Sequence, residues 1–465
     1  MSLLIVGLDT TIVNVALPSI HHALPSSLDG LQWTIDAYTL VLASLLVLSG
    51  SMADRLGRKR VFLCGLAIFS TGSLLCGLAP SLEALIASRA LQAVGGSMMN
   101  PVALSIIRNV FEEPRERARA IGVWGAMFGL SMALGPVLGG VLIDSFSWRA
   151  VFFVNVPVGL LAIALTALFV PESRAARPRA LDPIGQLLVV VVLGALTYAI
   201  IEGPRRGWGS VEILALFAAA AAAFVALIPF ELRRPEPLLE LRFFRSAPFS
   251  GASAIAVCAY GAFGGFLFLN TLYLQDVRGL SALDAGLYLL PMASMMLVFA
   301  PLSGRVIGSR GARPSLVVAG VAMTAAAAML TQLEPATSAP YLLGSYLVFG
   351  LGFGSINPPI TNTAVSGMPP AQAGVAGAIA SSSRQVGQTL GVALVGAIAG
   401  SGSVGIAIGR QFAAAAHPAF WVIVGLAAAV LALGALSTTR WAQRTARATA
   451  EQLLGEGPLI PGEPA

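Results

Sequence analysis

An aspartate and an arginine stand inside apolar stretches of the sequence, where charged side chains are rare. Asp9 lies in the run MSLLIVGLDTTIVNVALP, and Arg89 lies in another apolar run. A lone carboxylate in a bilayer costs roughly 2.5–3.5 kcal/mol, and a guanidinium cannot lose its proton. Arg89 therefore needs a carboxylate or carbonyl partner. Asp9 and Asp36 are the candidate acids at a comparable depth, and a carboxylate paired with Arg89 could take up and release a proton.

Each charge also has a purely structural explanation. Asp9 can be a protonated side chain that hydrogen-bonds a neighbouring helix, and Arg89 can bind backbone carbonyls. The residue patterns of enzymes are missing from the sequence. His21, His22 and His417 form no metal-ligand cluster, and the single lysine, Lys59, lies outside any phosphate-binding G-x4-G-K-[ST] loop. We expect no enzyme activity, no bound metal and no cofactor, and we exclude an ATP-driven pump for this chain alone.

The elements that must position these charges are membrane helices. The 465 residues are 56% hydrophobic and 11% charged, whereas soluble domains average about 25% charged residues. Windows of about 19 residues predict an all-α polytopic membrane protein with fourteen spans. The predicted spans are 1–22, 33–53, 60–79, 83–107, 118–143, 149–170, 182–202, 211–230, 249–275, 284–307, 314–333, 340–364, 371–400 and 417–439. Basic residues that usually precede a first span are missing, which leaves a longer N-terminus open.

The basic residues indicate the orientation of these spans. Most of the 28 lysines and arginines fall in the loops after even-numbered spans and in the C-terminal tail. Positive charge stays on the cytoplasmic side, so we expect both termini in the cytoplasm. The net charge of +6 then reports topology, and we expect no nucleic-acid partner.

An internal repeat divides the chain. The segment Gly50–Gly57 (GSMADRLG) recurs in weaker form as Gly304–Gly311 (GRVIGSRG), and GGSMMNP in the fourth span recurs as GFGSINP in the twelfth. Parallel six-helix repeats are a transporter architecture. We predict an N-terminal six-helix half at 1–170, an inserted helix pair at 171–245, a C-terminal half at 246–440, and a disordered cytoplasmic tail at 441–465.

Two further segments combine glycines with charges or proline. The loop GSMADRLGRKR can form an ion-pair cluster that gates the cytoplasmic side, or it can simply be a positive-inside loop. Its candidate residues are Gly50, Asp54, Arg55, Gly57 and Arg58, with glycine where the chain turns or helices approach. The fifth span carries small residues for close packing and a proline that kinks the helix. These residues are Gly125, Gly129, Gly135, Pro136, Gly139 and Gly140.

Together these segments resemble motifs of the major facilitator superfamily. GSMADRLGRKR is similar to its signature loop. Arg89-Ala-Leu-Gln92 resembles its R-x-x-Q-G motif, which is associated there with proton transfer, although Ala93 stands where the first glycine is usual. The fifth-span motif resembles that of antiporters as opposed to symporters. The resemblance implies the major facilitator fold, with two six-helix halves.

Three other segments resemble the fourteen-span drug:proton antiporter branch, with its quaternary-ammonium and methylenomycin-type exporters. They are DTTIVNVALP from Asp9, WTIDAYTLVL from Trp33, and the segment Trp148–Gly159 at the sixth span. The resemblance implies a monomeric, bacterial cytoplasmic-membrane exporter of hydrophobic or cationic drugs that binds protons, drug-like substrate and lipid. It assigns coupling or cation recognition to Asp9, Asp36 and Arg89. The polar candidates for its cavity are Asn14, Tyr38, Gln92, Asn357 and Arg384.

The thirteenth span departs from some members of that branch. Those members carry an acid there, and this sequence has Arg384 instead, which casts doubt on divalent organic cations as substrates. We consider Asp36 as a partner of Arg384, and we expect Glu202 and Asp276 to be solvated acids at helix ends. The competing functions on the same fold are a proton-coupled uptake symporter and an exporter of one specific metabolite.

Overall fold

The computed structural model describes residues 1–465 except 112, 176–179, 367, 369–371, 402–411 and 456–465. The described residues form helices and connecting loops without a β-strand. Inside a bilayer a helix satisfies every backbone hydrogen bond within the segment, which explains why the long apolar runs are helical. The all-α membrane architecture is thereby confirmed.

The number of membrane spans depends on the length and hydropathy of each helix. Among the described residues, 13 helices are long and apolar enough to cross a membrane. Helix α15 (Ala373–Ser401) is 29 residues long but falls outside this set. Its polar stretch SSSRQVGQ lowers its hydropathy. The count of fourteen therefore stays a prediction.

The first group of helices, which we call the N-terminal half, runs from α1 to α7. Its sixth predicted span is broken into the short α6 and the longer α7 at Val154. The bounds are α1 (Ser2–Ala23), α2 (Leu28–Leu56), α3 (Arg58–Leu78), α4 (Leu82–Val110), α5 (Pro114–Ser145), α6 (Ala150–Phe153) and α7 (Asn155–Phe169).

The second group, which we call the C-terminal half, runs from η1 to α16. Its first spanning helix, α10, continues into a π-helical segment, η2. The bounds are η1 (Leu241–Arg245), α10 (Ala247–Leu272), η2 (Tyr273–Val277), α11 (Ala282–Tyr288), α12 (Leu290–Arg310), α13 (Arg313–Leu330), α14 (Ala339–Val365), α15 (Ala373–Ser401) and α16 (Phe412–Ser437).

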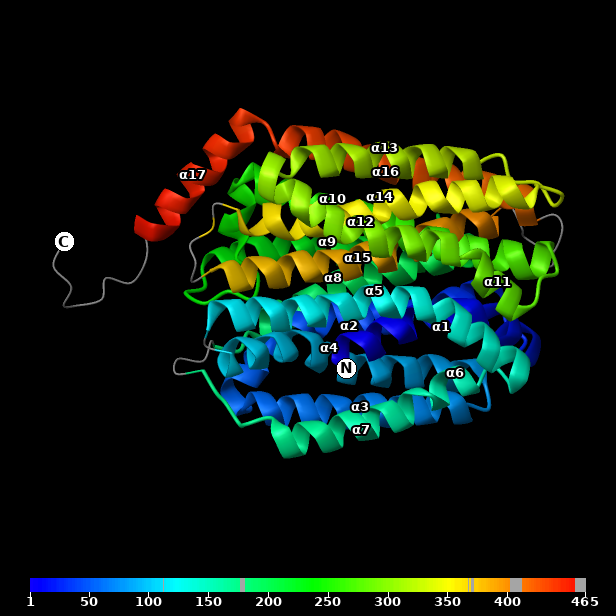
Figure 1. Cartoon of the computed structure of the whole chain (residues 1–465), viewed down its shortest axis with the longest axis horizontal. Helices are drawn as coiled ribbons and strands as arrows, with labels where there is room; N and C mark the ends of the chain where they lie inside the picture. The colour runs from blue at the N-terminus through cyan, green and yellow to red at the C-terminus, as the bar shows by residue number, and fades with distance from the viewer. Residues whose placement is uncertain (112, 176–179, 367, 369–371, 402–411, 456–465) are drawn as a thin grey trace.

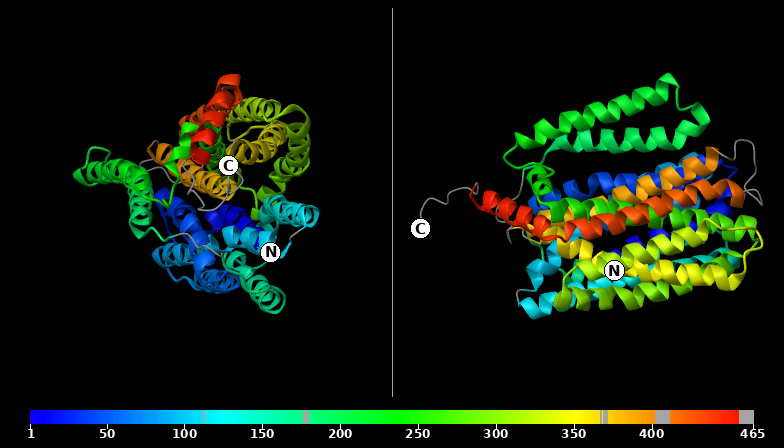
Figure 2. Two further views of the ribbon diagram at one scale, coloured as in Figure 1. Left: turned by 90° about the vertical axis from the view of Figure 1, so that its left-hand side faces the viewer. Right: turned by 90° about the horizontal axis from the view of Figure 1, so that it is seen from above.

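The helices of both halves run roughly parallel to one axis, as Figure 1 shows. Seen along that axis in Figure 2, the N-terminal half (blue to cyan) and the C-terminal half (green-yellow to orange) lie next to each other. Helix α15 packs against α10 in its own half and against α2 in the other half, while α5 contacts α11 and α12. The interface between the halves is therefore built by α2 and α15 and by α5, α11 and α12.

The inserted pair, α8 (Pro183–Arg206) and α9 (Val211–Leu232), stands beside the bundle. Helix α8 contacts both α2 and α15, and α9 packs mainly on α8. Glu202 of α8 is buried and accepts hydrogen bonds from the Trp33 indole of α2 and from Arg205 and Arg206. The prediction that Glu202 is a solvated acid is therefore wrong, because it ties the inserted pair to the N-terminal half.

The C-terminal tail differs from the sequence prediction. Residues Arg440–Gly455 form a helix, α17, where we predicted disorder from 441. The segment RWAQRTARATAEQLLG is rich in good helix formers, and it buries one face. Leu453 packs with Phe243 and Phe249, and the Thr445 hydroxyl accepts a hydrogen bond from the backbone N–H of Ala247. Residues 456–465 lie outside the described part of the chain.

Candidate functional site

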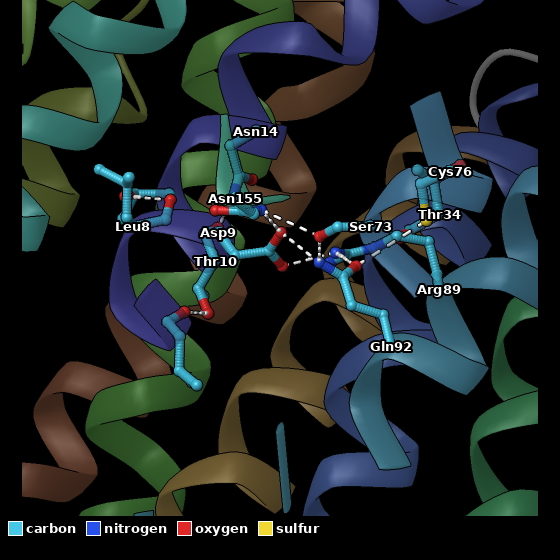
Figure 3. Close-up of polar contacts among 12 residues, drawn as sticks. Leu8, Asp9, Thr10, Asn14, Thr34, Ser73, Cys76, Arg89, Gln92 and Asn155 are labelled. Carbon is cyan, nitrogen blue, oxygen red and sulfur yellow. Dashed lines mark hydrogen bonds and ion pairs between the residues drawn. The ribbon is translucent and has the colours of Figure 1, made fainter. Parts of the chain in front are cut away.

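Asp9 lies at the centre of a buried polar network inside the N-terminal half (Figure 3). Its side chain is 0% exposed, and the guanidinium Nη1 of Arg89 donates to its Oδ2 at 2.5 Å. Its Oδ1 accepts from Gln92 Nε2 at 2.8 Å and from Asn155 Nδ2 at 3.0 Å. These contacts join α1, α4 and α7. The pairing of Arg89 with Asp9 rather than with Asp36 answers the question that the sequence left open.

Arg89 is fully enclosed by partners, with 1% of its side chain exposed. Its Nε donates to the backbone carbonyl of Thr34 at 3.1 Å, and its Nη1 also donates to Gln92 Oε1 at 2.7 Å. The guanidinium carbon lies 4.2 Å from the centre of the Tyr38 ring. A carboxylate, a carbonyl and an aromatic face thus replace the water that a buried arginine loses.

Two members of this network were not among the predicted site residues. Ser73 of α3 accepts from Gln92 Nε2 at 2.6 Å and from Asn155 Nδ2 at 3.2 Å. Asn155 lies in a segment that supported the resemblance, so its position was a usable signal. Ser73 stands in an ordinary apolar span, and nothing in its surroundings marks it.

Asp36 occupies a separate position on α2. It is fully buried, its Oδ1 accepts from Thr39 at 3.3 Å, and its Oδ2 has no hydrogen-bond partner. The Thr39 hydroxyl in turn accepts from Thr389 of α15 at 2.8 Å. Asp36 therefore lies next to a contact between the two halves.

The suggested pair between Asp36 and Arg384 is wrong. Arg384 donates to the hydroxyls of Ser381 at 3.3 Å and Thr361 at 2.6 Å, and the described residues contain no ion pair that includes it. Its hydrogen-bond partners are instead hydroxyl groups on α15 and α14.

The other polar candidates divide into two groups. Tyr38 and Gln92 belong to the Asp9 network, as ring and hydrogen-bond partners of Arg89. Asn14 donates to the carbonyl of Thr10 within α1, and Asn357 lies on α14 with its carbonyl oxygen unpaired. Asn14 and Asn357 thus stand outside the network.

The loop between α2 and α3 holds its predicted charges together. Arg58 donates to Asp54 Oδ1 from Nε at 3.1 Å and from Nη2 at 2.9 Å. Gly57 has φ 112°, a backbone conformation that favours glycine, and a Cβ there would lie 2.7 Å from Glu172. Glu172 also accepts from the backbone N–H of Lys59. The loop is thus tied to the segment after α7, within the N-terminal half.

Gly50 behaves differently from the other residues of the loop motif. It lies inside α2, and a Cβ there would approach only Pro101, at 3.9 Å. This distance is ordinary van der Waals contact. The expectation that Gly50 serves a tight turn or a close approach is therefore not met in this structure. Arg55, the remaining predicted residue, lies in the last turn of α2.

The glycines of the fifth-span motif have two different environments. A Cβ at Gly135 or Gly139 would collide with Thr11 or Ile12 of α1, at 1.9 and 2.7 Å. A Cβ at Gly140 would lie 2.4 Å from Leu283 of α11, in the other half. Pro136 lies between these positions, inside α5. This part of the motif brings α5 against both α1 and α11.

The first two glycines of the motif lack such neighbours. A Cβ at Gly125 would meet nothing within 4 Å, and one at Gly129 would lie 3.6 Å from Leu297 of α12. Gly304 of α12 likewise has open space around it. Helix α5 thus approaches α11 closely near Gly140, whereas its contact with α12 near Gly129 is an ordinary one.

Comparison with known proteins decides the family. The sequence model described as the Major Facilitator Superfamily matches residues 1–392. The chain belongs to the major facilitator superfamily. This transporter is 37% identical over 398 residues to the multidrug resistance protein Stp of Mycobacterium tuberculosis (strain CDC 1551 / Oshkosh), covering 86% of this chain and 74% of Stp.

Other relatives carry names of the same kind. The tetracenomycin C resistance and export protein of Streptomyces glaucescens is 38% identical over 403 residues, covering 86% of this transporter and 74% of that protein. The methylenomycin A resistance protein of Bacillus subtilis (strain 168) is 33% identical over 426 residues, covering 90% and 91%. The resemblance to this group of transporters is confirmed.

Solved structures support the fold independently. A bacterial homologue of the human lysosomal transporter Spinster, in an inward-facing and unoccupied conformation, aligns with a TM-score of 0.63 at 18% identity. The alignment covers 98% of this transporter and 96% of that chain. At this identity the likeness concerns the fold alone.

In this transporter the halves are joined at the end of the bundle where α1 ends and α2 begins. Gln32 of α2 donates to the carbonyl of Ala393 at 3.0 Å, and Gln275 of η2 donates to the carbonyl of Val15 at 2.9 Å. Asp144 accepts from the N–H of Leu283 at 3.0 Å. The structure is thus closed at this end, which the distribution of basic residues predicts to be external.

Asp276 takes part in the same closure. Its side chain is 7% exposed, and Oδ1 lies 3.8 Å from Nε2 of His22 on α1. It belongs to the π-helical segment η2, and such segments are frequent at functional sites. The prediction that Asp276 is a solvated loop acid is wrong, because the contact between the halves covers it.

Proposed function

We propose that this transporter exports hydrophobic, drug-like molecules, antibiotics among them, in exchange for protons by alternating access. Its relatives are named for resistance to, or export of, drugs and antibiotics. The two halves, 1–170 and 246–440, would rock about the Asp9 region, with the inserted pair at 171–245 beside them. We place it as a monomer in the bacterial cytoplasmic membrane with both termini in the cytoplasm.

The buried contact between Asp9 and Arg89 carries this proposal. All three neighbours of the Asp9 carboxylate act as donors, which suits its deprotonated, acceptor-only form. Adding a proton would remove one acceptor position and the negative charge that answers Arg89. Since Arg89 keeps its charge, the network must then rearrange. A proton on Asp9 is thereby linked to the relative positions of α1, α4 and α7.

The closed external end corresponds to one step of the proposed export cycle. In the proposed cycle, Asp9 has released its proton toward the cytoplasm when the external end is closed. The next step of an export cycle is capture of substrate from the cytoplasmic side. Opening the external end then releases the substrate and gives Asp9 access to an external proton. The glycine contacts of α5 with α11 form and break the external closure.

The test is proton-driven efflux in everted membrane vesicles. Asp9→Asn keeps the size of the side chain and its carbonyl acceptor but removes the titratable group. We expect at least about a tenfold loss of pH-driven transport of a fluorescent drug. Glu212→Gln, at an exposed ion pair on α9, serves as the control and should transport normally.

Full transport by Asp9→Asn under a proton gradient would contradict the mechanism. Substrate accumulation driven by inward proton flow, measured in right-side-out vesicles, would instead support an uptake symporter. That alternative lacks support from the names of the relatives.

A further inference from the structure

Arg384 is a positive charge inside the C-terminal half that forms no ion pair with any carboxylate in the described part of the chain. It lies 11 residues, or about 16 Å, along α15 from the start of that helix. Between Gly286 and Arg440 the sequence contains a single acid, Glu334, in the loop between α13 and α14. Asp276 and Asp284, which precede this stretch, lie at the external end, so the spanning helices that follow Gly286 carry no acid to neutralise Arg384.

The hydroxyl groups around Arg384 leave much of its donor capacity unused. Ser381 and Thr361 occupy Nη1 and Nη2, and Nε is buried without a partner. A guanidinium has five N–H donors in a planar fork that matches an oxyanion. Hydroxyl groups supply hydrogen bonds without supplying negative charge. The arrangement is thus incomplete as an ion pair.

Part of the Arg384 side chain is accessible to solvent. Its side chain is half-buried, and Thr361 beside it is exposed although both residues belong to long membrane helices. Ionisable side chains within spanning helices face the bundle interior or a water-filled cavity rather than lipid. Arg384 also lies five residues from Thr389, which contacts Thr39 of the other half. Arg384 thus lies on a helix that also contributes to the interface between the halves.

Accessibility decides which charge an incoming molecule meets. Asp36, the nearby acid of the N-terminal half, is fully buried beside Thr39, and Asp9 is closed off by Arg89. In the conformation closed at the external end, the half-buried Arg384 is therefore the charge open to substrate. This selects against cations and favours an oxyanion.

We propose that Arg384, with Thr361 and Ser381, binds an acidic oxygen of the substrate, so that the exported molecules are amphipathic compounds carrying a carboxylate or phenolate. The inference rests on the proposed export function and narrows its substrate class. The substrate anion supplies the negative charge that the C-terminal half lacks. Its hydrophobic part remains free to contact the apolar walls.

The test is equilibrium binding of two dyes to the purified, full-length transporter in lipid nanodiscs, followed by fluorescence anisotropy. Fluorescein carries a carboxylate and a phenolate, and rhodamine 6G is an esterified, cationic dye on the same ring system. We expect the wild type to prefer fluorescein. Arg384→Gln should weaken fluorescein binding at least about tenfold, the scale of one charge-assisted contact. Binding of rhodamine 6G should be unchanged or tighter.

Three further variants make the result specific. Arg233→Gln removes one exposed positive charge outside the bundle and should bind both dyes as the wild type does. Arg384→Lys keeps the charge without the planar fork and should retain part of the preference for fluorescein. If Arg384→Gln does not yield monodisperse protein, Thr361→Val takes its place, with an expected loss of about twofold to fivefold for fluorescein alone.

Equal binding of fluorescein by the wild type and Arg384→Gln, or a wild-type preference for rhodamine 6G, would overturn the proposal. This outcome is separable from failure of the export function. Dye preference is measured at equilibrium without a proton gradient, and efflux is measured separately in vesicles. If the wild type shows the charge preference but no proton-driven efflux, the anion site stands and the antiport function fails.

Discussion

Gly286 of α11 lies directly against the backbone carbonyl of Pro136 in α5, so that a Cβ on the glycine would be 2.3 Å from that oxygen. The contact joins the two halves at the closed end of the bundle, next to the contact between Gly140 and Leu283. The α5 glycine motif thus has a partner glycine in the other half. Glycine is required in both α5 and α11 for their backbones to approach this closely.

Gly286→Val should therefore open the external end. The added side chain cannot fit against Pro136, and overpacking of this kind costs about 1–3 kcal/mol in the closed conformation. Spin labels at Pro25→Cys and Ala336→Cys, both on exposed loops at that end, measure the opening as a longer distance. The exposed Cys64 is replaced by serine in this background.

Gly425→Val is the matched control for this measurement. Gly425 lies on α16, and a Cβ added there would meet nothing within 4 Å, so the same substitution should leave the label distance unchanged. An unchanged distance in Gly286→Val itself would show that the glycine contact does not hold the external end closed.

The ion pair between Asp9 and Arg89 predicts a non-additive effect on stability. Arg89→Met leaves the carboxylate buried with only its amide donors, and breaking such a pair costs about 3–5 kcal/mol. Asp9→Leu combined with Arg89→Met removes both charges and should be more stable than Arg89→Met alone. Melting temperatures of the purified variants in detergent test this. If the change in melting temperature of the double variant equals the sum of the changes in Asp9→Leu and Arg89→Met, the two residues are not directly coupled.

Much of the fold was predictable because membrane helices depend on local composition. Apolar runs of sufficient length must be helical in a bilayer, and a charge inside such a run needs a partner. These two rules predicted the helices and the need of Arg89 for a carboxylate or carbonyl partner. The repeat of the GSMADRLG loop then indicated two related halves.

The positions that sequence analysis missed depend on contacts between distant segments. Ser73 and Asn155 meet Asp9 only because α3, α7 and α1 pack together. Glu202 and Asp276 stand at helix ends, where solvent is the usual partner, but tertiary packing covers both. Hydropathy predicts how long a helix is and gives no information about which neighbour covers its end.

Helix α17 should stabilise the start of α10. The Thr445 hydroxyl accepts from the N–H of Ala247 at 3.0 Å, so Thr445→Val leaves an unpaired donor and should cost about 0.5–1.5 kcal/mol. Hydrogen exchange at the first turn of α10 should become faster. The exposed Arg447→Gln on the same helix is the control. Unchanged exchange in Thr445→Val would mean that α17 does not cap α10.

The inserted pair should move with the N-terminal half during transport. Its polar contacts to the bundle go to α2: Gln186 donates to the Ser44 carbonyl at 2.7 Å, and Trp33 donates to Glu202 at 3.2 Å. Its contact with α15 is apolar, between Ile200 or Ile201 and Ala393 or Ala397. Hydrogen bonds fix relative position, whereas an apolar contact of small side chains allows sliding.

Spin labels can distinguish the two attachments. A label at Phe224→Cys on α9 is paired either with Leu74→Cys on α3 or with Val321→Cys on α13, all at exposed positions. When Gly286→Val opens the external end, the distance to position 74 should stay constant and the distance to position 321 should change. A constant distance to position 321 with a changing distance to position 74 would instead assign the inserted pair to the C-terminal half. Trp33→Phe, which removes the bond to Glu202, should broaden the first distance without altering its mean, because Gln186 still holds α8 on α2.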